Sequence, residues 1–445
     1  MKKSLRTWGL ALLSVMMMIA AVPRTACATS ATAAAQPQDE YQKQLEDTYK
    51  QEVQTNQLKD WPQGPGIYGD AGIVMDAQTG AILYGKNIDA AEYPASITKI
   101  LTALLALKYC DMTDEVTISA ECLSCLGDGY ASIGMKEGNV ITMEQALYAM
   151  LLASSNEVAC AVGETVAKKQ GKDYQWFIEE MNRTVRELGG TNSNFVNTNG
   201  VHDEQHYTCA RDMALIAKEL FNYPEFLTIC QTATYTIPAS DTTEEHVFWQ
   251  KHEMLLPGSK DSYEYAVGGK TGYTTEANNT LVTMADNGSM KLVCVTLKIF
   301  PGHVYSDTRA LLDYGFQNFQ HVSVEKEEHA NIKKMPENAQ VTLPTGMDTK
   351  KLDSKLGSST GANNLELLSY TYEDNPVGEM QVEVKKDASF KEADAGEEET
   401  GEKGGILKTV MIFAAVLLAV FVLACLYASH CRRKRKKRRR RRRRR

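Results

Sequence analysis

The chain has 445 residues, 43% of them hydrophobic and 24% charged, which is enough for more than one folded domain. Its formal net charge is −7, but the last 14 residues, Arg432–Arg445, are all basic, so the rest of the chain carries −21. A body this acidic argues against a protein whose main surface binds nucleic acid.

The first 28 residues have the parts of a secretory signal. A positively charged start at residues 2–6 is followed by an apolar stretch of 15 residues, Trp8 to Val22, and by the small residues Ala26 and Ala28 at a cleavage position. The stretch is short for a membrane-spanning helix, which favours a cleaved signal over an N-terminal anchor. We therefore predict that residues 1–28 are a signal peptide and that the body is exported.

Residues 29–64 predict a linker followed by a polar, exposed helix, and residues 65–320 then alternate between strand and helix patterns. Short apolar runs predict strands at 72–75, 81–84, 281–284 and 291–299. Apolar residues recur every three or four positions in three long segments, which predict helices at Ser96–Cys110, Met143–Ala167 and Trp176–Leu188. Strands at both ends with helices between them favour an α+β fold, an antiparallel sheet covered by helices.

The C-terminal part predicts a membrane anchor. Residues 321–388 alternate short apolar runs with turns and predict a small β domain, and residues 389–405 predict a flexible acidic stalk. Residues 406–428 are almost wholly apolar and predict a single transmembrane helix. Basic residues beside such a helix mark the cytoplasmic side, so we expect residues 429–445 in the cytoplasm and the body outside the cell. We expect Arg432–Arg445 to bind anionic lipid headgroups rather than nucleic acid, and a plain stop-transfer role is compatible with this.

Cysteine and histidine spacing gives no clear metal site. Seven cysteines lie between the predicted cleavage site and the predicted membrane helix, an odd number that leaves at least one unpaired: Cys110, Cys122, Cys125, Cys160, Cys209, Cys230 and Cys294. The pair Cys122 and Cys125 lacks a second pair at zinc-finger spacing, which favours a loop disulfide or two free thiols. His202 and His206 also lack further ligands and predict a surface loop, so we expect no metal and no cofactor.

Ser96 and Lys99 have the spacing of a nucleophile and its base. Pro94 disfavours helix just before it, so a helix is expected to begin near Ser96. Lys99 would then lie on the same helical face, and the Ser96 N–H at the helix start could donate to an oxyanion. Lys99 can remove a proton if burial and a second cation, Lys270, lower its pKa. Taken alone, the same spacing fits a helix cap beside a solvated lysine.

Two further segments contain the other residue types that this chemistry needs. Ser154-Ser155-Asn156 places polar residues inside an apolar helical pattern, at a cost in helix stability that the wall of an active cleft would explain, although a local turn is the alternative. Ser154 could pass a proton to a leaving amine, and Asn156 could hold Lys99 and a substrate amide. Lys270-Thr271-Gly272, with Tyr273 after it, follows two glycines and on its own could be a turn.

In this order, the three segments resemble the signature of the active-site serine penicillin-recognising enzymes. The similarity is greatest to D-alanyl-D-alanine carboxypeptidases, the low-molecular-mass penicillin-binding proteins, over roughly residues 68–320. Further similar segments are Met181–Gly189, Phe195–Gly200, His206–Ala214 and Leu311–Phe316. The resemblance implies a β-lactamase/transpeptidase-like fold and removal of the terminal D-alanine from peptidoglycan stem pentapeptides through an acyl-enzyme that penicillins trap.

The resemblance also implies roles for the third segment, and it shows one departure. The segment would be a strand along which the substrate peptide adds, with Lys270 and Thr271 holding its terminal carboxylate and the Tyr273 N–H as second oxyanion donor. Gly272 would let the substrate approach closely. Family members often carry a carboxylate-binding arginine about ten residues before the Tyr-Gly-Phe end, where this chain has Val304, with His303 and Arg309 nearby.

Two other functions remain open at this point. A β-lactamase needs an activated water for fast deacylation, and the sequence between Asn156 and Lys270 offers no convincing glutamate for it. A non-catalytic, wall-associated membrane protein could keep the fold and lose the reaction. The lifetime of a penicillin adduct on Ser96 distinguishes a β-lactamase, which turns the adduct over in seconds, from a carboxypeptidase, on which it persists. Retained function after Ser96→Ala would support the non-catalytic role.

Overall fold

The computed structural model describes residues 38–385, apart from residues 125, 128, 325–331 and 358–364. The predicted signal peptide, stalk, transmembrane helix and basic tail lie outside the described residues, and so does Cys125. Within the part that is described, no helix is long and apolar enough to cross a membrane.

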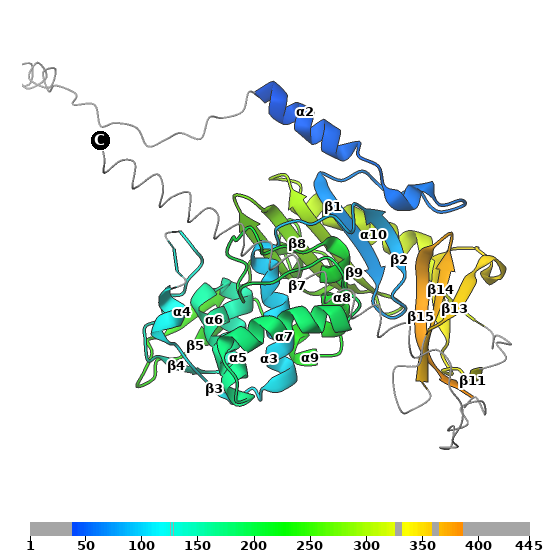
Figure 1. The fold of residues 1–445 in the computed structure, drawn as a ribbon. Helices are drawn as coiled ribbons and strands as arrows, with labels where there is room; N and C mark the ends of the chain where they lie inside the picture. The colour runs from blue at the N-terminus through cyan, green and yellow to red at the C-terminus, as the bar shows by residue number, and fades with distance from the viewer. Residues whose placement is uncertain (1–37, 125, 128, 325–331, 358–364, 386–445) are drawn as a thin grey trace, which may run out of the picture. The chain divides into compact units, whose positions relative to one another are not determined.

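A five-stranded antiparallel sheet forms the centre of the molecule, with the strand order β2-β1-β9-β8-β7 (Figure 1). Its strands are β1 (Gly69–Asp76), β2 (Ile82–Lys86), β7 (Ala266–Thr274), β8 (Asn278–Asp286) and β9 (Lys291–Ile299). All four strands expected from apolar runs belong to this sheet. β7 lies at one edge and has a strand neighbour on one side only.

Helices cover both faces of this sheet. Side chains of β1 alternate between the faces: Ile73 and Met75 pack among residues of α3 and α8, whereas Val74 packs with Leu311 and Leu312 of α10. The α-helices are α2 (Gln38–Tyr49), α3 (Lys99–Tyr109), α4 (Ala120–Ser124), α5 (Met143–Tyr148), α6 (Asn156–Lys169), α7 (Tyr174–Glu187), α8 (Ala210–Leu220), α9 (Pro224–Gln231) and α10 (Val304–Asn318). Short 3₁₀ turns lie at η1 (Gln54–Gln57), η2 (Ala95–Thr98), η4 (Glu253–Leu255) and η5 (Thr349–Lys351), and a π-helical turn at η3 (Ala149–Ala153).

Two of the predicted helices are interrupted at the Ser96 and Ser154 segments. The expected helix at Ser96–Cys110 begins instead as the 3₁₀ turn η2, and α-helical geometry starts only at Lys99. The expected helix at Met143–Ala167 is wrong in its middle, because α5 passes into the π-turn η3 and α6 starts afresh at Asn156. Polar residues that compete for backbone hydrogen bonds explain the second break.

The described part of segment 29–64, which begins at Gln38, packs on the core, and the predicted linker before it lies outside the described residues. Trp61 is 4% exposed, and its Nε1 donates to the Leu83 carbonyl at 3.0 Å. The polar helix α2 ends at Tyr49, and one side of it is buried through Leu45 and Thr48.

A second β region follows α10 (Figure 1). It pairs β10 (Phe319–Ser323) with β12 (Gln340–Pro344) and contains a sheet of order β11-β15-β14-β13, formed by β11 (Ile332–Lys334), β13 (Asp353–Leu356), β14 (Leu365–Tyr372) and β15 (Asn375–Val384). Buried Asp76 ties this region to the central sheet, since it accepts from His321 Nε2 at 2.7 Å and Thr342 Oγ1 at 2.8 Å. The predicted domain boundaries at 320 and 388 stay predictions.

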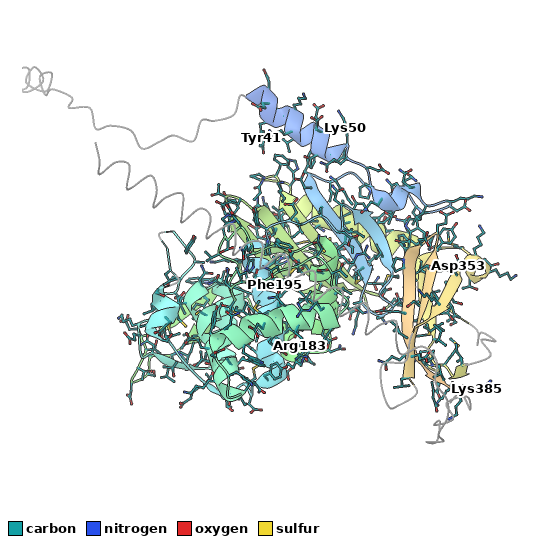
Figure 2. The ribbon with its side chains drawn as sticks, viewed as in Figure 1. Tyr41, Lys50, Arg183, Phe195, Asp353 and Lys385 are labelled. Atoms are coloured by element: carbon teal, nitrogen blue, oxygen red, sulfur yellow. The ribbon has the colours of Figure 1, made fainter. Side chains whose placement is uncertain are left out.

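Two small hairpins complete the fold, β3 (Glu115–Thr117) with β4 (Val140–Thr142) and β5 (Thr234–Ile237) with β6 (His246–Trp249). In Figure 2, Phe195 lies in the interior of the helical part, whereas Arg183 lies on the outer side of α7.

Candidate active site

The turn η2 places Ser96 at a half-buried position, on strained backbone. The preceding Ala95 has φ 50°, a left-handed conformation that is uncommon for a residue with a side chain. Gly200 makes room for this turn, because a Cβ at Gly200 would lie 1.8 Å from the Ala95 carbonyl oxygen. The serine turn and the Gly200 loop therefore fit together only with glycine at that position.

Lys99 lies directly behind Ser96 and is fully buried. Its Nζ lies 3.0 Å from Ser96 Oγ, 2.7 Å from Asn156 Oδ1 and 2.7 Å from the Asn199 carbonyl oxygen. Burial, and then the positive charge of Lys270, hold the pKa of Lys99 well below its usual range. A neutral amine at this position can donate to the Asn156 and Asn199 oxygens and accept from the Ser96 hydroxyl, which is the arrangement that a general base needs.

Ser154 and Asn156 reach this centre because the backbone turns sharply between η3 and α6. Ser154 has φ 65° in the left-handed region, and Ser155 caps α6 by accepting from the Val158 N–H at 3.3 Å. The Asn156 N–H donates to the Ala131 carbonyl at 2.9 Å, while its side-chain oxygen accepts from Lys99. The polar segment that interrupts the helical pattern is thus a tight turn and also a contact of the base.

The third segment lies in the edge strand β7. A Cβ at Gly272 would lie 3.0 Å from the Ser96 nitrogen and 2.3 Å from Thr280 Oγ1, so glycine lets the strand lie against the serine turn. Lys270 is 2% exposed, and burial, then the charge of Lys251, lower its pKa to about 7. Its Nζ donates to the Thr271 carbonyl at 2.9 Å.

A cleft of about 340 Å³ opens between β7 and the Ser154 turn. Five of the eight predicted site residues line it: Ser96, Ser154, Thr271, Gly272 and Tyr273. The other three, Lys99, Asn156 and Lys270, are buried behind its surface. The remaining residues of the lining are Ala131, Lys251, Asn279, Thr280, Val304 and Tyr305.

Sequence reasoning missed several of these residues for physical reasons. The Asn199 carbonyl is a backbone group, which has no sequence signal apart from the Asn-Gly pair that turns the chain there. Ala131 and Tyr305 reach the cleft from loop and helix starts that no local pattern marks. Arg309 does not replace the arginine missing at Val304, because its Nη2 donates to the Asp261 carbonyl at 3.1 Å and the Ser262 carbonyl at 2.6 Å.

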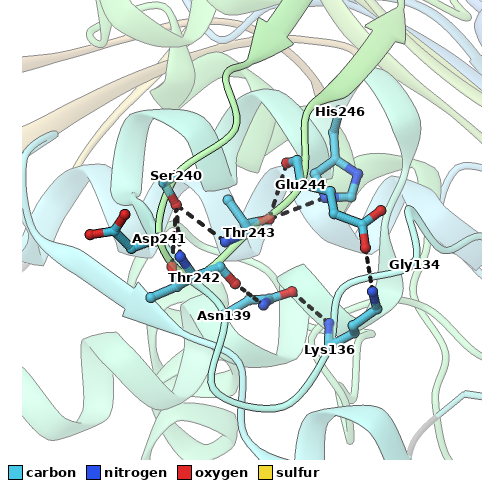
Figure 3. A pocket seen from close by; sticks show the side chains of 9 residues that line it. All are labelled: Gly134, Lys136, Asn139, Ser240, Asp241, Thr242, Thr243, Glu244 and His246. Atoms are coloured by element: carbon cyan, nitrogen blue, oxygen red, sulfur yellow. Dashed lines mark hydrogen bonds and ion pairs between the residues drawn. The ribbon is translucent and has the colours of Figure 1, made fainter.

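Two exposed loops support the Ala131 side of the cleft. Figure 3 shows them around a separate polar pocket of about 260 Å³, where Lys136 pairs with Glu244 and Asn139 donates to the Thr242 carbonyl. Nearer the cleft, buried Glu157 accepts from the Ile133 N–H at 2.8 Å and from a serine hydroxyl in the same loop. These contacts fix the loop and engage Glu157 Oε1.

His206 is a buried structural residue, so its prediction as part of a surface loop is wrong. It is 2% exposed, its Nδ1 accepts from the Val196 N–H at 3.2 Å, and its Nε2 lies 2.9 Å from Thr98 Oγ1. Both ring nitrogens are therefore engaged, and burial lowers the pKa of His206 to about 3.

The cysteines of the described part, at positions 110, 122, 160, 209, 230 and 294, form no disulfide bonds with one another. Cys122, Cys160 and Glu164 bring their ligand atoms within 4.8 Å of one another. Three donors are one short of the closed four-ligand set of a structural zinc site, and Ser119 already donates to Glu164 at 3.0 Å. This cluster carries no metal assignment.

The antiparallel sheet, its helical layers and the three assembled segments define a penicillin-binding, transpeptidase-like α+β protein. The chain belongs to the D-alanyl-D-alanine carboxypeptidase family, whose model matches residues 58–300.

Individual relatives agree with this assignment. The carboxypeptidase DacF of Bacillus subtilis is 28% identical over 75% of this chain and 79% of its own length. DacB2 of Mycobacterium tuberculosis is 30% identical over 57% of this chain and 84% of the relative, whereas the match to Escherichia coli DacC spans 64% of that relative. Among solved structures, a Streptomyces DD-transpeptidase has a TM-score of 0.52 at 26% identity, over 57% of this chain and 99% of its own.

Proposed function

We propose that the protein is a serine-type D-Ala-D-Ala carboxypeptidase that removes the terminal D-alanine from peptidoglycan stem pentapeptides. The observation that carries this proposal is the position of the Lys99 amine, 3.0 Å from Ser96 Oγ and 2.7 Å from Asn156 Oδ1 in a fully buried site. A buried lysine without a paired carboxylate is costly unless its neutral form is used.

In the acylation step, Ser96 Oγ attacks the carbonyl carbon of the penultimate D-alanine and its proton passes to Lys99 Nζ. The charge that develops on the substrate oxygen is stabilised by the backbone N–H groups of Ser96 and Tyr273. Gly272, directly before Tyr273 in the chain, permits the close approach of β7 to the serine turn.

The departing D-alanine needs a proton on its nitrogen, and the Ser154 hydroxyl in the cleft wall passes it on from Lys99. A water molecule then hydrolyses the ester on Ser96 and regenerates the enzyme. The substrate backbone pairs with the free edge of β7, and Lys270 and Thr271 favour its terminal carboxylate. Penicillins acylate the same serine and act as covalent inhibitors.

The cleft lining favours hydrolysis of peptides over rapid turnover of β-lactams. None of the described residues that line it is a carboxylate, so no acidic base is in place to activate a deacylating water. A persistent penicillin adduct is therefore expected, whereas turnover within seconds would indicate a β-lactamase.

The test is the release of free D-alanine from a diacetyl-Lys-D-Ala-D-Ala peptide by the full-length protein in detergent. Ser96→Ala should abolish release, and Ser306→Ala, which changes an exposed serine outside the cleft, should not. Full biological function with Ser96→Ala would instead support a non-catalytic, wall-associated role.

The same reaction fits an enzyme on the outer side of the cell membrane. Residues 1–28 then direct export, residues 406–428 anchor the protein, and Arg432–Arg445 contacts anionic lipids on the cytoplasmic side. Protease added to intact spheroplasts should digest the catalytic body and spare a C-terminal epitope tag. Digestion of the tag with the body would contradict this orientation.

A further inference from the structure

Lys251 is the only charged side chain among the described residues that line the cleft. Its Nζ donates to the Ala153 carbonyl at 2.8 Å, which places the ammonium group beside the Ser154 turn. Thr271 lines the same cleft from β7. A cation therefore lies in the substrate cleft, near hydroxyl groups that the proposed reaction already uses.

The backbone on both sides of Lys251 is held by buried side chains. Gln250 Nε2 donates to the Cys230 carbonyl at 2.6 Å, and Gln250 Oε1 accepts from the His252 N–H at 2.9 Å. His252 is 1% exposed, and its Nε2 lies 3.0 Å from Thr283 Oγ1 of β8. Tyr305, itself in the cleft lining, donates to the Lys251 carbonyl at 3.3 Å. Lys251 itself is exposed, and this support holds its backbone in place, so that less freedom is lost when its side chain binds a ligand.

The surroundings of Lys251 leave its charge without a counter-ion. No described carboxylate forms an ion pair with it, and the charges of Lys251 and Lys270 both act to lower the pKa of Lys99. The neighbouring Glu253 is turned to its own loop, where Ser259 Oγ donates to it at 3.1 Å. An uncompensated cation in a partly desolvated cleft attracts an anionic ligand.

The other basic residues nearest to the Val304 position are engaged elsewhere. Arg309 donates to two loop carbonyls and lies over the Tyr263 ring at 5.1 Å, and the His303 ring stacks on Tyr68 at 3.8 Å. Val304 itself presents an apolar side chain to the cleft.

We propose that Lys251 binds the terminal carboxylate of the peptide substrate and makes the enzyme selective for a free C-terminus. This inference rests on the proposed function. It identifies Lys251 as the positively charged group that contacts the carboxylate of the departing D-alanine. Lys251 supplies the charge as a point donor, and the hydroxyl groups of Ser154 and Thr271 supply directed hydrogen bonds.

The experiment compares two peptides, diacetyl-Lys-D-Ala-D-Ala with a free carboxylate and the same peptide as a C-terminal amide. Lys251→Met should lower kcat/KM for the acid by roughly 10- to 100-fold, the usual effect of losing a hydrogen bond to a charged group, and change the amide by less than about 2-fold. Lys251→Arg should retain most of the preference for the acid. Lys260→Met is the matched control, because Lys260 lies in the same loop with an 83% exposed side chain and does not line the cleft.

An equal loss for both peptides, or no loss for either, would overturn the proposal. Isothermal titration calorimetry of the two peptides with the full-length Ser96→Ala protein distinguishes failure of the Lys251 proposal from failure of the proposed function. If the wild type releases no D-alanine but Ser96→Ala binds the acid in preference to the amide only while Lys251 is present, the reaction is wrong and the Lys251 site stands. If Ser96→Ala shows no preference with Lys251 intact, the Lys251 site is wrong.

Discussion

The two walls of the cleft are built in opposite ways. One wall is β7, a regular strand whose backbone pairs with β8 along nearly its whole length. The other wall is irregular, since it consists of the π-turn η3, the left-handed Ser154 and the fresh start of α6 at Asn156. The regular pairing of β7 leaves a strand edge to which a peptide can add. The irregular turn instead places the side chains of Ser154 and Asn156 close to the reacting atoms.

Substitution of Lys99 should have the largest effect on D-alanine release, because its amine contacts both the Ser96 turn and Asn156 at the start of α6. Lys99→Met keeps the volume of the side chain but removes the amine that contacts Ser96 and Asn156. We expect loss of at least roughly 10⁴-fold in D-alanine release, because both the base and the proton relay are removed. The Met variant should still fold, since it no longer buries an amine, and circular dichroism at rising temperature checks this. Activity within about tenfold of wild type would exclude Lys99 as the base.

Gly272 tests the regular wall. A side chain at this position meets Thr280 Oγ1 and the backbone nitrogen of Ser96, so Gly272→Val should push β7 away from the serine turn. We expect kcat/KM to fall by roughly 100-fold, the scale on which an error of about 1 Å in positioning affects catalysis. Gly272→Ala, with less to accommodate, should fall between Val and wild type. Equal activity of all three proteins would show that the close approach of strand and serine is not needed.

Ser154 tests the irregular wall by separating its backbone from its hydroxyl group. Ser154→Gly relieves the left-handed conformation and Ser154→Ala keeps it, but both remove the hydroxyl. If the hydroxyl relays the proton, both variants should lose about 100-fold in release rate, with unfolding free energies within about 1 kcal/mol of each other. Normal activity of Ser154→Gly would mean that only the turn matters.

Substitution of His206, which contacts Thr98 of the serine turn, should have the smallest effect, and we expect it in the pH dependence of stability. Its folded pKa of about 3 lies below the ordinary value of 6.5, so the unfolded chain binds the extra proton between these values. Stability should therefore rise with pH from about 3 to 6.5 and be fully present above that range. Between pH 7 and pH 5, the wild type should lose about 2 kcal/mol more than His206→Gln in urea unfolding. Parallel pH profiles of the two proteins would contradict a buried neutral His206.

The regular parts of the molecule were predictable from sequence because their patterns are local. Alternating and continuous apolar runs predicted four of the five strands of the central sheet, with Lys291–Ile299 matching β9 at both ends. The helix at Trp176–Leu188 corresponds to α7 within two residues, since its apolar stripe repeats without a polar break. The α+β class followed from the order of these elements.

The irregular wall could not be derived in the same way. A π-turn and a left-handed serine depend on contacts with distant segments, such as the bond from the Asn156 N–H to the Ala131 carbonyl. The spacing of Ser96 and Lys99 indicated the base, yet the turn that presents them is 3₁₀ rather than α-helical. Lys251 had no sequence signal at all, because only the fold brings residue 251 beside Ser154 and Thr271.

The most direct test is to map the covalent adduct of a penicillin on the full-length protein by mass spectrometry. The arrangement of Lys99, Asn156 and β7 around Ser96 predicts a single penicilloyl group on the peptide that contains Ser96, and none after Lys99→Met. An adduct on another residue, or unchanged labelling of the Lys99→Met protein, would contradict a lysine-activated serine at this site.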